Sequence, residues 1–464
     1  MERRLPIFIA VLLVAMAGHC RAEEDRPYDV LLRNYAPYCA AGDDLAFPMK
    51  VWGLSKDQHT FWRGSRDLYY AWCRAHARDW LDDRGAYRLN HGDLHLGNIG
   101  SYARGGGPLG ATSFGAVDFD ETARLPFQVE LLQGLITIRL TARRNGIDLS
   151  GRREALARAM VDAYRAAVAS GKTTRELVSA ERRIGTFVDQ AQKHSYDRTL
   201  EKFTEDGRFL RYVRSRKSPA TKEILRPAMD RADDLARGLA QAIGRSPAAR
   251  AAFRYADEPT IRRSIKDVSL RTRLESVGSQ GLRKYLVLLE RPLRGMDADV
   301  VMYVKQEVPS AAERSGAIPR DPRSPGRRCS EDMDRLTNPT AYLNAWCDIG
   351  GESYWVSFKE PWSEEIELEM ARGYESLLAF ARVWGSVAGA MHRAQGDAGA
   401  ILARVDRPGF FDQLRHRGTL YMAELDRQYH DFTRDPRARE AAGRAQGRID
   451  AARVSVRAGM EDGR

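Results

Sequence analysis

Apolar residues recur at helical spacing through much of the chain, most clearly between about residues 127 and 260. In the segment 153–168 they fall on one face at i, i+4 spacing, which predicts an amphipathic helix. The positions in question are Leu156, Met160, Tyr164 and Val168. A longer amphipathic helix is predicted over 373–394, and its inward positions are expected to be Leu378, Ala381, Gly385 and Ala388. The Arg- and Ala-rich segment after Pro436 lacks an apolar face, so it is expected to be an exposed or frayed helix.

The period of the pattern changes after residue 260. Residues 270–292 and 297–311 are rich in β-branched residues, alternate in polarity and carry glycines between them, which predicts three antiparallel strands. Residues 354–362 predict another strand. The expected fold class is therefore α+β. The expected divisions are a mainly helical catalytic lobe over 23–260, a strand-rich lobe over 261–365, a helical return over 366–435 and a charged tail over 436–464.

Composition and charge narrow the possible classes of protein. The chain has 464 residues, of which 43% are hydrophobic and 30% are charged, and this balance excludes disorder throughout and a multi-span membrane protein. Lys and Arg total 74 against 63 Asp and Glu, so the formal net charge is +11. That excess suits an anionic partner. No nucleic-acid-binding motif accompanies it, so a nucleic acid partner is not expected.

The first 22 residues have the layout of a secretory signal peptide. A basic start is followed by an apolar run over 5–18 and a small-x-Ala pattern that ends at Ala22. Cleavage after Ala22 would make the protein secreted or periplasmic, with no stable membrane span; an uncleaved anchor is the alternative. The mature chain would keep four cysteines, which form up to two disulfides in an oxidising compartment or remain buried thiols. These are Cys39, Cys73, Cys329 and Cys347.

Two segments, HGDLHLGNIG at 91–100 and AVDFDE at 116–121, carry the most informative polar residues. Phosphoryl transfer needs a carboxylate within hydrogen-bond reach of the attacking hydroxyl, and oxygen ligands that hold magnesium on the donor phosphates. Asp93, Asn98 and Asp118 supply that set. The short gap between the first two lets one loop present both, and Asp118 would come from the end of the next hairpin.

HGDLHLGN and VDFD resemble the catalytic and metal-binding segments of aminoglycoside- and choline-kinase-type phosphotransferases, which have the protein-kinase-like fold. More closely, most of the chain is similar to the bacterial uncharacterised-domain family 2252 (DUF2252). The shared motifs are FWRG at 61–64, VDFDET with a following LPF, SVGSQG at 276–281, YVKQEVPSA at 303–311 and MHRA at 391–394. The resemblance implies Mg²⁺ and ATP or another nucleotide as cofactors, with a small hydroxyl- or amine-bearing acceptor. It implies Asp93 as the catalytic base and Asn98, Asp118 and Asp120 as metal ligands.

The order of these motifs is unusual, because in protein kinases the glycine-rich loop and the strand lysine precede the catalytic loop. Here SVGSQG and Lys305 follow it by about two hundred residues, which implies a circularly permuted kinase-like fold. Gly278 and Gly281 would let a turn approach phosphates closely, and Lys305 would pair with phosphate oxygens. Supporting roles are expected for His91, His95, Arg63 and Glu331, the last as the group that orients Lys305. The chain departs from the family at 127–135, where it has FQVELLQGL, with Glu130 and Gln133, in place of an acidic residue and an Arg-Leu pair. This departure concerns the outer support of the site and not the residues expected to contact metal or substrate.

Two other functions fit the same residues. His91, Asp93 and His95 would share one face of a strand and, with Asp118 and Asp120, could bind metal directly in a secreted phosphoesterase. That function suits an exported protein better than ATP use does, but it assigns no role to Lys305. A kinase-shaped binding protein without catalysis is the other alternative.

Several of these residues also have purely structural interpretations. Asp120 suits a helix N-cap, the glycines of SVGSQG suit a tight hairpin, and Lys305 suits a solvated edge strand. Arg63 fits a structural ion pair equally well. His392, at the end of an apolar helix, is interpreted as a packed histidine.

Overall fold

The computed structural model describes residues 26–40, 43–103, 112–178, 182–214, 221–273, 277–337 and 343–461. The expected signal peptide over 1–22 and Ser276 of the SVGSQG motif lie outside the described residues. Helices and antiparallel sheets are both well represented, so the α+β class is confirmed.

The helices are α2 (Pro27–Asn34), α3 (Ala46–Leu54), α4 (Gln58–Gly64), α5 (Arg66–His76), α6 (Arg78–Asp82), α7 (Phe127–Arg144), α8 (Arg153–Ser170), α9 (Thr174–Val178), α10 (Arg182–Gln192), α11 (Asp197–Phe203), α12 (Ala232–Arg245), α13 (Pro247–Ala252), α14 (Glu258–Ser264), α15 (Ala311–Arg314), α16 (Pro325–Leu336), α17 (Tyr374–Arg393), α18 (Ala398–Val405), α19 (Phe410–Arg434) and α20 (Pro436–Glu461). The strands are β1 (Tyr87–Asn90), β2 (Ile99–Ala103), β3 (Thr112–Ala116), β4 (Ala123–Pro126), β5 (Thr204–Glu205), β6 (Arg208–Phe209), β7 (Tyr212–Arg214), β8 (Thr221–Pro227), β9 (Ile265–Arg273), β10 (Lys284–Leu289), β11 (Val300–Glu307), β12 (Ala345–Ile349), β13 (Glu352–Phe358) and β14 (Glu364–Glu365).

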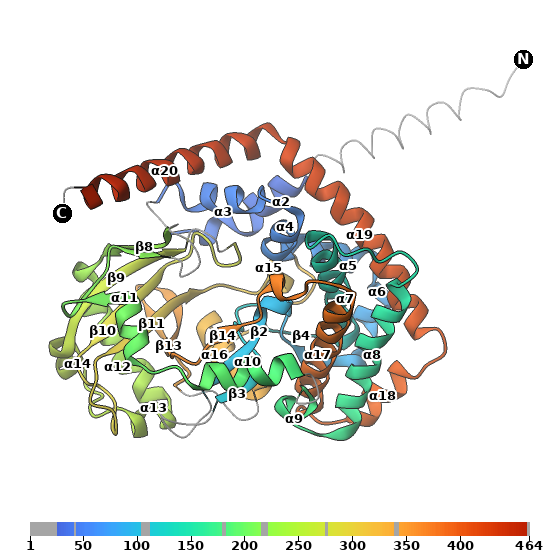
Figure 1. Ribbon diagram of the computed structural model, residues 1–464, viewed down its shortest axis with the longest axis horizontal. Coiled ribbons are helices and arrows are strands. Elements are labelled where there is room, and N and C mark those ends of the chain that lie inside the picture. Colours follow the sequence, from blue (N-terminus) through green and yellow to red (C-terminus); the bar gives the residue numbers. More distant parts are fainter. Residues whose placement is uncertain are drawn as a thin grey trace, which may run out of the picture.

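Seven strands form one large antiparallel sheet in the order β12–β13–β11–β10–β9–β8–β7. The strands predicted over 270–311 correspond to β9, β10 and β11, and the strand predicted at 354–362 corresponds to β13, so these predictions are confirmed. The large sheet lies on the left of Figure 1, and the long helices α7, α8 and α17 lie on the right.

Both faces of the central strands are buried, which explains the continuous apolar run of β10. Tyr285, Val287 and Leu289 face a core shared with α12. Leu286 and Leu288 face the other way, into a smaller apolar cluster. Residues directly opposite in an antiparallel pair share a face, so Lys284 and its partner Lys305 lie on the side of this smaller cluster.

The helical half of the molecule, which comprises α4–α9 and α17–α19, is built around the contact between α8 and α17. The predicted inward face of α8 is buried throughout. On α17, a Cβ at Gly385 would come within 2.1 Å of the carbonyl oxygen of Met160, so glycine permits the close approach of the two helices. Ala381 and Ala388 are buried as predicted, whereas Leu378 is only half-buried.

Two short sheets lie near the centre of Figure 1 and carry the polar motifs. Strand β1 pairs with β4, and β2 forms a hairpin with β3 that β14 extends. The loop of HGDLHLGN follows β1, and the VDFD segment follows β3. The expectation that Asp118 follows a hairpin is therefore confirmed.

The prediction of helices throughout 127–260 is wrong between Thr204 and Pro227, where β5 to β8 occur. Strands β7 and β8 join the large sheet through β9. They are short or irregular in register, and they lie between helices, so their apolar residues show no clear period of two. Pairing with the preformed neighbour β9 supplies the hydrogen bonds that the local pattern does not indicate.

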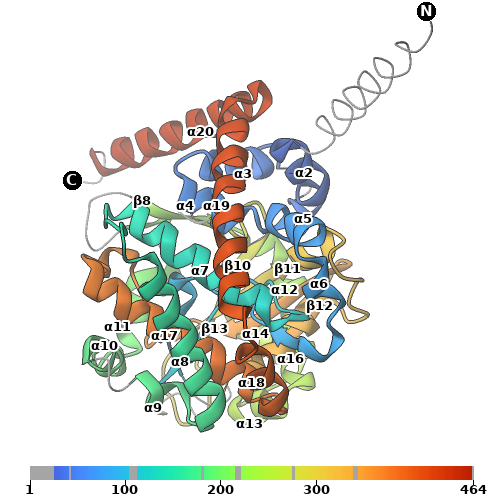
Figure 2. The same cartoon turned by 90° about the vertical axis from the view of Figure 1, so that its right-hand side faces the viewer.

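The prediction that the segment after Pro436 lacks an apolar face is also wrong. Helix α20 buries Ala445 and Ile449 against Met49 of α3. Trp52 donates a hydrogen bond from Nε1 to Gln446 at 2.6 Å. Figure 2 shows α19 running along the outside of the helical half and α20 continuing over α3.

Among the described helices, none has the length and apolarity that crossing a membrane requires. The four cysteines after the expected signal peptide are all free thiols.

Candidate active site

The backbone of the HGD turn is held by a buried polar network. Gly92 has a φ of +81°, and a Cβ there would lie 1.9 Å from the carbonyl oxygen of Glu121. Its N–H donates to Glu130 Oε1 at 3.0 Å. Its carbonyl oxygen accepts from Tyr70 Oη at 2.8 Å and from Gln133 Nε2 at 3.0 Å. Glu130 and Gln133 therefore hold the backbone of the HGD turn from outside the site.

The same network reaches the end of α17. Glu130 Oε2 lies 2.9 Å from Nε2 of His392, and the other ring nitrogen of His392 lies 2.9 Å from the hydroxyl of Tyr164. His392 is fully buried, in agreement with its interpretation as a packed histidine. Sequence reasoning missed the partnership of Glu130 and Gln133 with Gly92. Three polar residues within the otherwise apolar first turns of α7, Gln128, Glu130 and Gln133, are the signal that could have indicated it.

Asp93 is buried close to two arginines, of which Arg66 contacts it. It forms an ion pair with Arg66, and burial raises the pKa of its carboxyl group although Arg66 and Arg63 oppose the shift. Arg63 donates from Nε to His95 Nε2 at 2.9 Å. Burial and the nearby Arg63 hold the pKa of His95 well below its ordinary value. Arg66, which sequence reasoning did not select, thus favours the ionised form of the candidate base and opposes the effect of burial.

His91 and Asn98 shape the loop that carries Asp93. The N–H of Asp93 donates to His91 Nδ1 at 3.3 Å, so His91 donates from Nε2 to the carbonyl oxygen of Val117 at 2.9 Å. Asn98 donates from Nδ2 to the carbonyl oxygen of Asp93 at 3.0 Å, which leaves its amide oxygen as a ligand atom. Residues 91–95 form a loop and not the strand that the phosphoesterase hypothesis assumed. Both ring nitrogens of His91 and Nε2 of His95 already form hydrogen bonds, whereas Nδ1 of His95 is buried without a partner.

The ammonium group of Lys305 joins the large sheet to the VDFD segment. Its Nζ lies 2.8 Å from Asp118 Oδ1 and also donates to Asp120. Lys305 is 3% exposed, so the interpretation as a solvated edge-strand lysine is wrong. Although burial opposes it, Lys305 holds the pKa of Asp118 below its usual value, whereas burial and the neighbouring Asp118 raise the pKa of Asp120.

The backbone at Asp118 has a φ of +66°, in the left-handed region. Non-glycine residues rarely adopt this conformation, and it persists where the surrounding structure compensates its energetic cost. Asp120 does not cap a helix, because the chain continues from it into β4. The conformation of this segment directs both carboxylates to one ammonium group.

The carboxylates around Lys305 outnumber the positive charge that they share. Glu307 lies 3.9 Å from Lys305, its Oε1 is buried without a hydrogen-bond partner, and burial and Asp120 raise its pKa well above the ordinary value. Ligand atoms of Asp120, Glu307 and Cys329 lie within 4.8 Å of one another. Carboxylate oxygens are the ligands that Mg²⁺ prefers, so Asp118, Asp120 and Glu307 fit a hard cation.

On the adjacent strand β10, by contrast, a buried positive charge lacks a negative partner. Lys284 is 3% exposed, and no hydrogen bond or ion pair joins its ammonium group to another described residue. Burial and the neighbouring Lys305 hold the pKa of Lys284 well below its ordinary value. A buried ammonium without a counterion costs free energy, which an anionic group placed beside it would recover. Sequence reasoning missed Lys284, since its position beside Lys305 depends on strand register.

The glycine motif takes a different role from the one expected. Gly278 lies beside the site, but its carbonyl oxygen accepts from Lys50 Nζ at 2.6 Å and from Tyr35 Oη at 3.1 Å. Gly281 has a φ of +90°, and a Cβ there would lie 2.8 Å from the carbonyl oxygen of Ala46 on α3. Gly281 therefore permits packing against α3, and Lys50 with Tyr35 holds the turn in place.

Lys50 predicts a specific dependence of stability on pH. Burial lowers its pKa from 10.5 to about 8. Between these two values the unfolded chain binds more protons than the folded protein, so the contribution of Lys50 to stability rises with pH; below about pH 8 the cost of the buried charge is fully present. Relative to Lys50→Met, the wild type should gain on the order of 3 kcal/mol between pH 7.5 and 10.5, measured by urea unfolding. The exposed Lys193→Met variant is the control, and equal pH profiles of wild type and Lys50→Met would contradict the prediction.

Glu331 does not orient Lys305. Its carboxylate pairs with Arg323 at 3.2 Å and with Arg327 at 2.7 Å. Arg328, three residues earlier on α16, donates to the carbonyl oxygens of Asp120 and Thr122, each at 2.6 Å. Arg328 and not Glu331 is therefore the residue of this helix that contacts the VDFD segment.

A narrow cavity of about 30 Å³ lies between the helical half and the large sheet. Five of the predicted site residues line it, namely Arg63, Asp93, Asp118, Asp120 and Gly278, together with Glu307. Sites for small molecules typically measure 300–1,000 Å³. A ligand as large as a nucleotide therefore requires the two parts to move apart.

Comparison with known proteins identifies the family of the chain. The family model described as "Uncharacterized protein conserved in bacteria (DUF2252)" matches residues 43–435. The chain belongs to this family. None of the curated proteins or solved structures matches it. In this DUF2252 chain the matched region contains every residue of the site described above except Tyr35, so the geometry around Lys305 lies within the family region.

Proposed function

We propose that this protein is a magnesium-dependent phosphotransferase with a circularly permuted kinase-like arrangement, which transfers a phosphoryl group from a nucleotide to a small acceptor. The observation that carries the proposal is the bridge from Lys305 to Asp118 and Asp120. In protein kinases a strand lysine pairs with the nucleotide phosphates, and an aspartate that follows the catalytic loop binds the metal. Here the lysine comes from a strand almost two hundred residues after the aspartates.

Each charged group then has a role in such a reaction. Asp93 would accept the proton of the attacking hydroxyl, and Arg66 favours the ionised form of its carboxylate until then. Lys305 and Lys284 would neutralise the donor phosphates. Asn98, Asp118 and Asp120 would hold Mg²⁺, which when bound would neutralise charge on those phosphates. The carboxylate excess around Lys305 and the lone ammonium of Lys284 are complementary to a magnesium ion and a polyphosphate.

The experiment is thermal unfolding of the protein with Mg²⁺ and ATP, with each alone, and with neither. A ligand at one hundred times its Kd stabilises the folded state by about 2.7 kcal/mol, or a few degrees in Tm. We expect the shift only when both are present. Asp118→Asn should abolish it while folding normally, because asparagine tolerates a positive φ.

Asp148→Asn, at an exposed carboxylate in the turn before α8, is the matched control and should keep the full shift. The proposal fails if no nucleotide produces a magnesium-dependent shift, or if both variants respond equally.

The ion pair between Arg66 and Asp93 favours a second candidate, a nucleotide-binding protein without phosphoryl transfer. An arginine on the candidate base lowers its basicity. Formation of ADP from ATP distinguishes the two functions: binding without ADP formation in the presence of varied hydroxyl and amine acceptors would support the second.

A further inference from the structure

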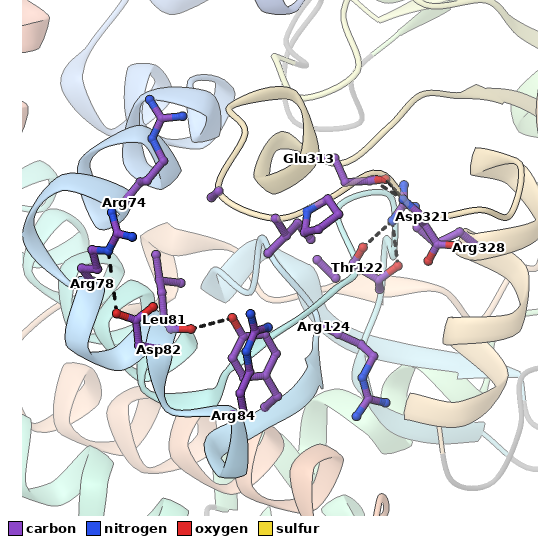
Figure 3. A pocket seen from close by; sticks show the side chains of 15 residues that line it. Arg74, Arg78, Leu81, Asp82, Arg84, Thr122, Arg124, Glu313, Asp321 and Arg328 are labelled. Carbon is purple, nitrogen blue, oxygen red and sulfur yellow. Dashed lines mark hydrogen bonds and ion pairs between the residues drawn. The ribbon is translucent and has the colours of Figure 1, made fainter.

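A second and larger pocket, of about 500 Å³, opens where β4 begins. It shares no lining residue with the narrow cavity that Asp93, Asp118 and Asp120 line. Figure 3 shows Arg74 and Arg78 on one wall and Glu313, Asp321 and Arg328 on the other. Its volume lies within the range of small-molecule sites. The site thus has room for a ligand without any movement of the two parts of the molecule.

Arginines dominate the charged lining of this pocket. The arginines are Arg74, Arg78, Arg84, Arg124 and Arg328, and the carboxylates are Asp82, Glu313 and Asp321. The guanidinium group of Arg328 already donates hydrogen bonds to the backbone carbonyl oxygens of Asp120 and Thr122. Arg78 lies 3.7 Å from Asp82 in an exposed pair, which contributes little attraction.

The carboxylates of Glu313 and Asp321 already form hydrogen bonds with other residues of the protein. Glu313 accepts from the N–H and hydroxyl of Ser310 and from the N–H of Asp321. Asp321 pairs with both sides of the Arg323 guanidinium, at 3.0 and 2.7 Å.

Three guanidinium groups therefore lack an acidic partner. Arg74, Arg84 and Arg124 form no hydrogen bond or ion pair with another described residue; Arg84 only stacks on Tyr87, 5.1 Å from the ring centroid. All three are exposed, so their long side chains can turn toward a ligand. Guanidinium forks match the oxygens of phosphates and carboxylates. Three guanidinium groups together would favour a ligand that carries more than one negative charge.

Much of the remaining lining is apolar. It comprises Leu81, Ala123 and the segment after α15, Ala317, Ile318 and Pro319. An inorganic ion would leave this surface unused, whereas an apolar group attached to the anion would cover it.

We propose that this pocket binds a small organic dianion, a phosphate monoester with an apolar body, between the arginines and the segment Ala317–Pro319. The proposal is independent of phosphoryl transfer. The floor of the pocket is Thr122, whose carbonyl oxygen and that of Asp120 are both held by Arg328. A ligand there bears directly on the segment that carries Asp118 and Asp120.

The test is calorimetric titration with phenyl phosphate, inorganic phosphate and benzoate at low ionic strength, where surface charges are least screened. Saturable binding of phenyl phosphate is expected, at least tenfold tighter than that of the other two. Arg84→Gln combined with Arg124→Gln should weaken it at least tenfold. The control pair Arg33→Gln and Arg250→Gln removes the same charge from exposed positions elsewhere and should have no effect.

Lys284→Met separates this pocket from the site around Lys305, and it should leave phenyl phosphate binding unchanged. The proposal is overturned if the wild type shows no saturable binding, if the control pair weakens binding as much as the Arg84 and Arg124 pair, or if Lys284→Met abolishes it. Equal affinity for benzoate or for inorganic phosphate overturns the assignment to an organic dianion.

Discussion

Lys305→Met is expected to destabilise the protein by about 1–3 kcal/mol, because it leaves the buried Glu307, the partly buried Asp120 and the half-exposed Asp118 without the cation that they share. Lys284→Met should do the opposite and stabilise the protein by on the order of 1–3 kcal/mol, since it removes a buried ammonium that has no counterion. The two lysines are directly opposite each other on β10 and β11 and are equally buried. Each substitution is therefore the matched control for the other.

Both variants should nevertheless weaken the binding of magnesium and ATP at least tenfold, since both remove a charge that would face the phosphates. Urea unfolding gives the stabilities, and thermal shifts with Mg²⁺ and ATP give the binding. A gain in stability together with a loss of binding at Lys284 would be typical of a residue kept for function. Equal destabilisation by the two substitutions would contradict the charge balance inferred for the site, and unchanged binding in Lys284→Met would contradict its role with the donor phosphates.

Gly92→Ala is expected to cost about 4 kcal/mol or more in the free energy of unfolding. The positive φ accounts for only part of that cost. The new Cβ would overlap the carbonyl oxygen of Glu121, and Gly92 cannot move away because Glu130 and Gln133 hold its backbone on both sides.

Gly146→Ala is the control for backbone conformation alone. Gly146 has a φ of +65°, and a Cβ there meets nothing within 4 Å, so its substitution should cost about 1 kcal/mol. Denaturant unfolding of both variants measures the difference. If the two substitutions cost the same, the close contact between Gly92 and Glu121 does not constrain the loop.

The elements that sequence periodicity predicted were those with long and regular patterns. Helices α8 and α17 and strands β9 to β11 each bury a continuous face, and a buried face imposes a period on the residues that form it. The short strands β7 and β8 were missed because their stability comes from pairing with β9. Helix α20 was misjudged for a related reason: its apolar contacts are alanines and one isoleucine, which indicate a buried face only when α3 is already in place.

The features of the candidate site also fall into those that the local sequence predicted and those that only the structure revealed. The spacing of Asp93 and Asn98 and the VDFD segment were readable because those residues are close in sequence and their chemistry is local. Lys305 was selected by its motif, but its contact with Asp118 and Asp120 required the sheet to fold back on the helical half. Glu331 was selected because it lies on a predicted helix, but the orientation of α16 places Arg328 of the same helix at the site.

The sequence by itself determined the types of the long elements, the α+β class and the residues of the HGDLHLGN and VDFD loops, because each depends on neighbours within a few positions. Only the tertiary structure decided which charges meet. The partners of Asp93, Gly92 and Lys305 come from elements far away in the chain, and Lys284 faces the site only because β10 pairs with β11 in one particular register. Electrostatic interactions depend on distance in space and on burial, and neither can be read from separation along the chain.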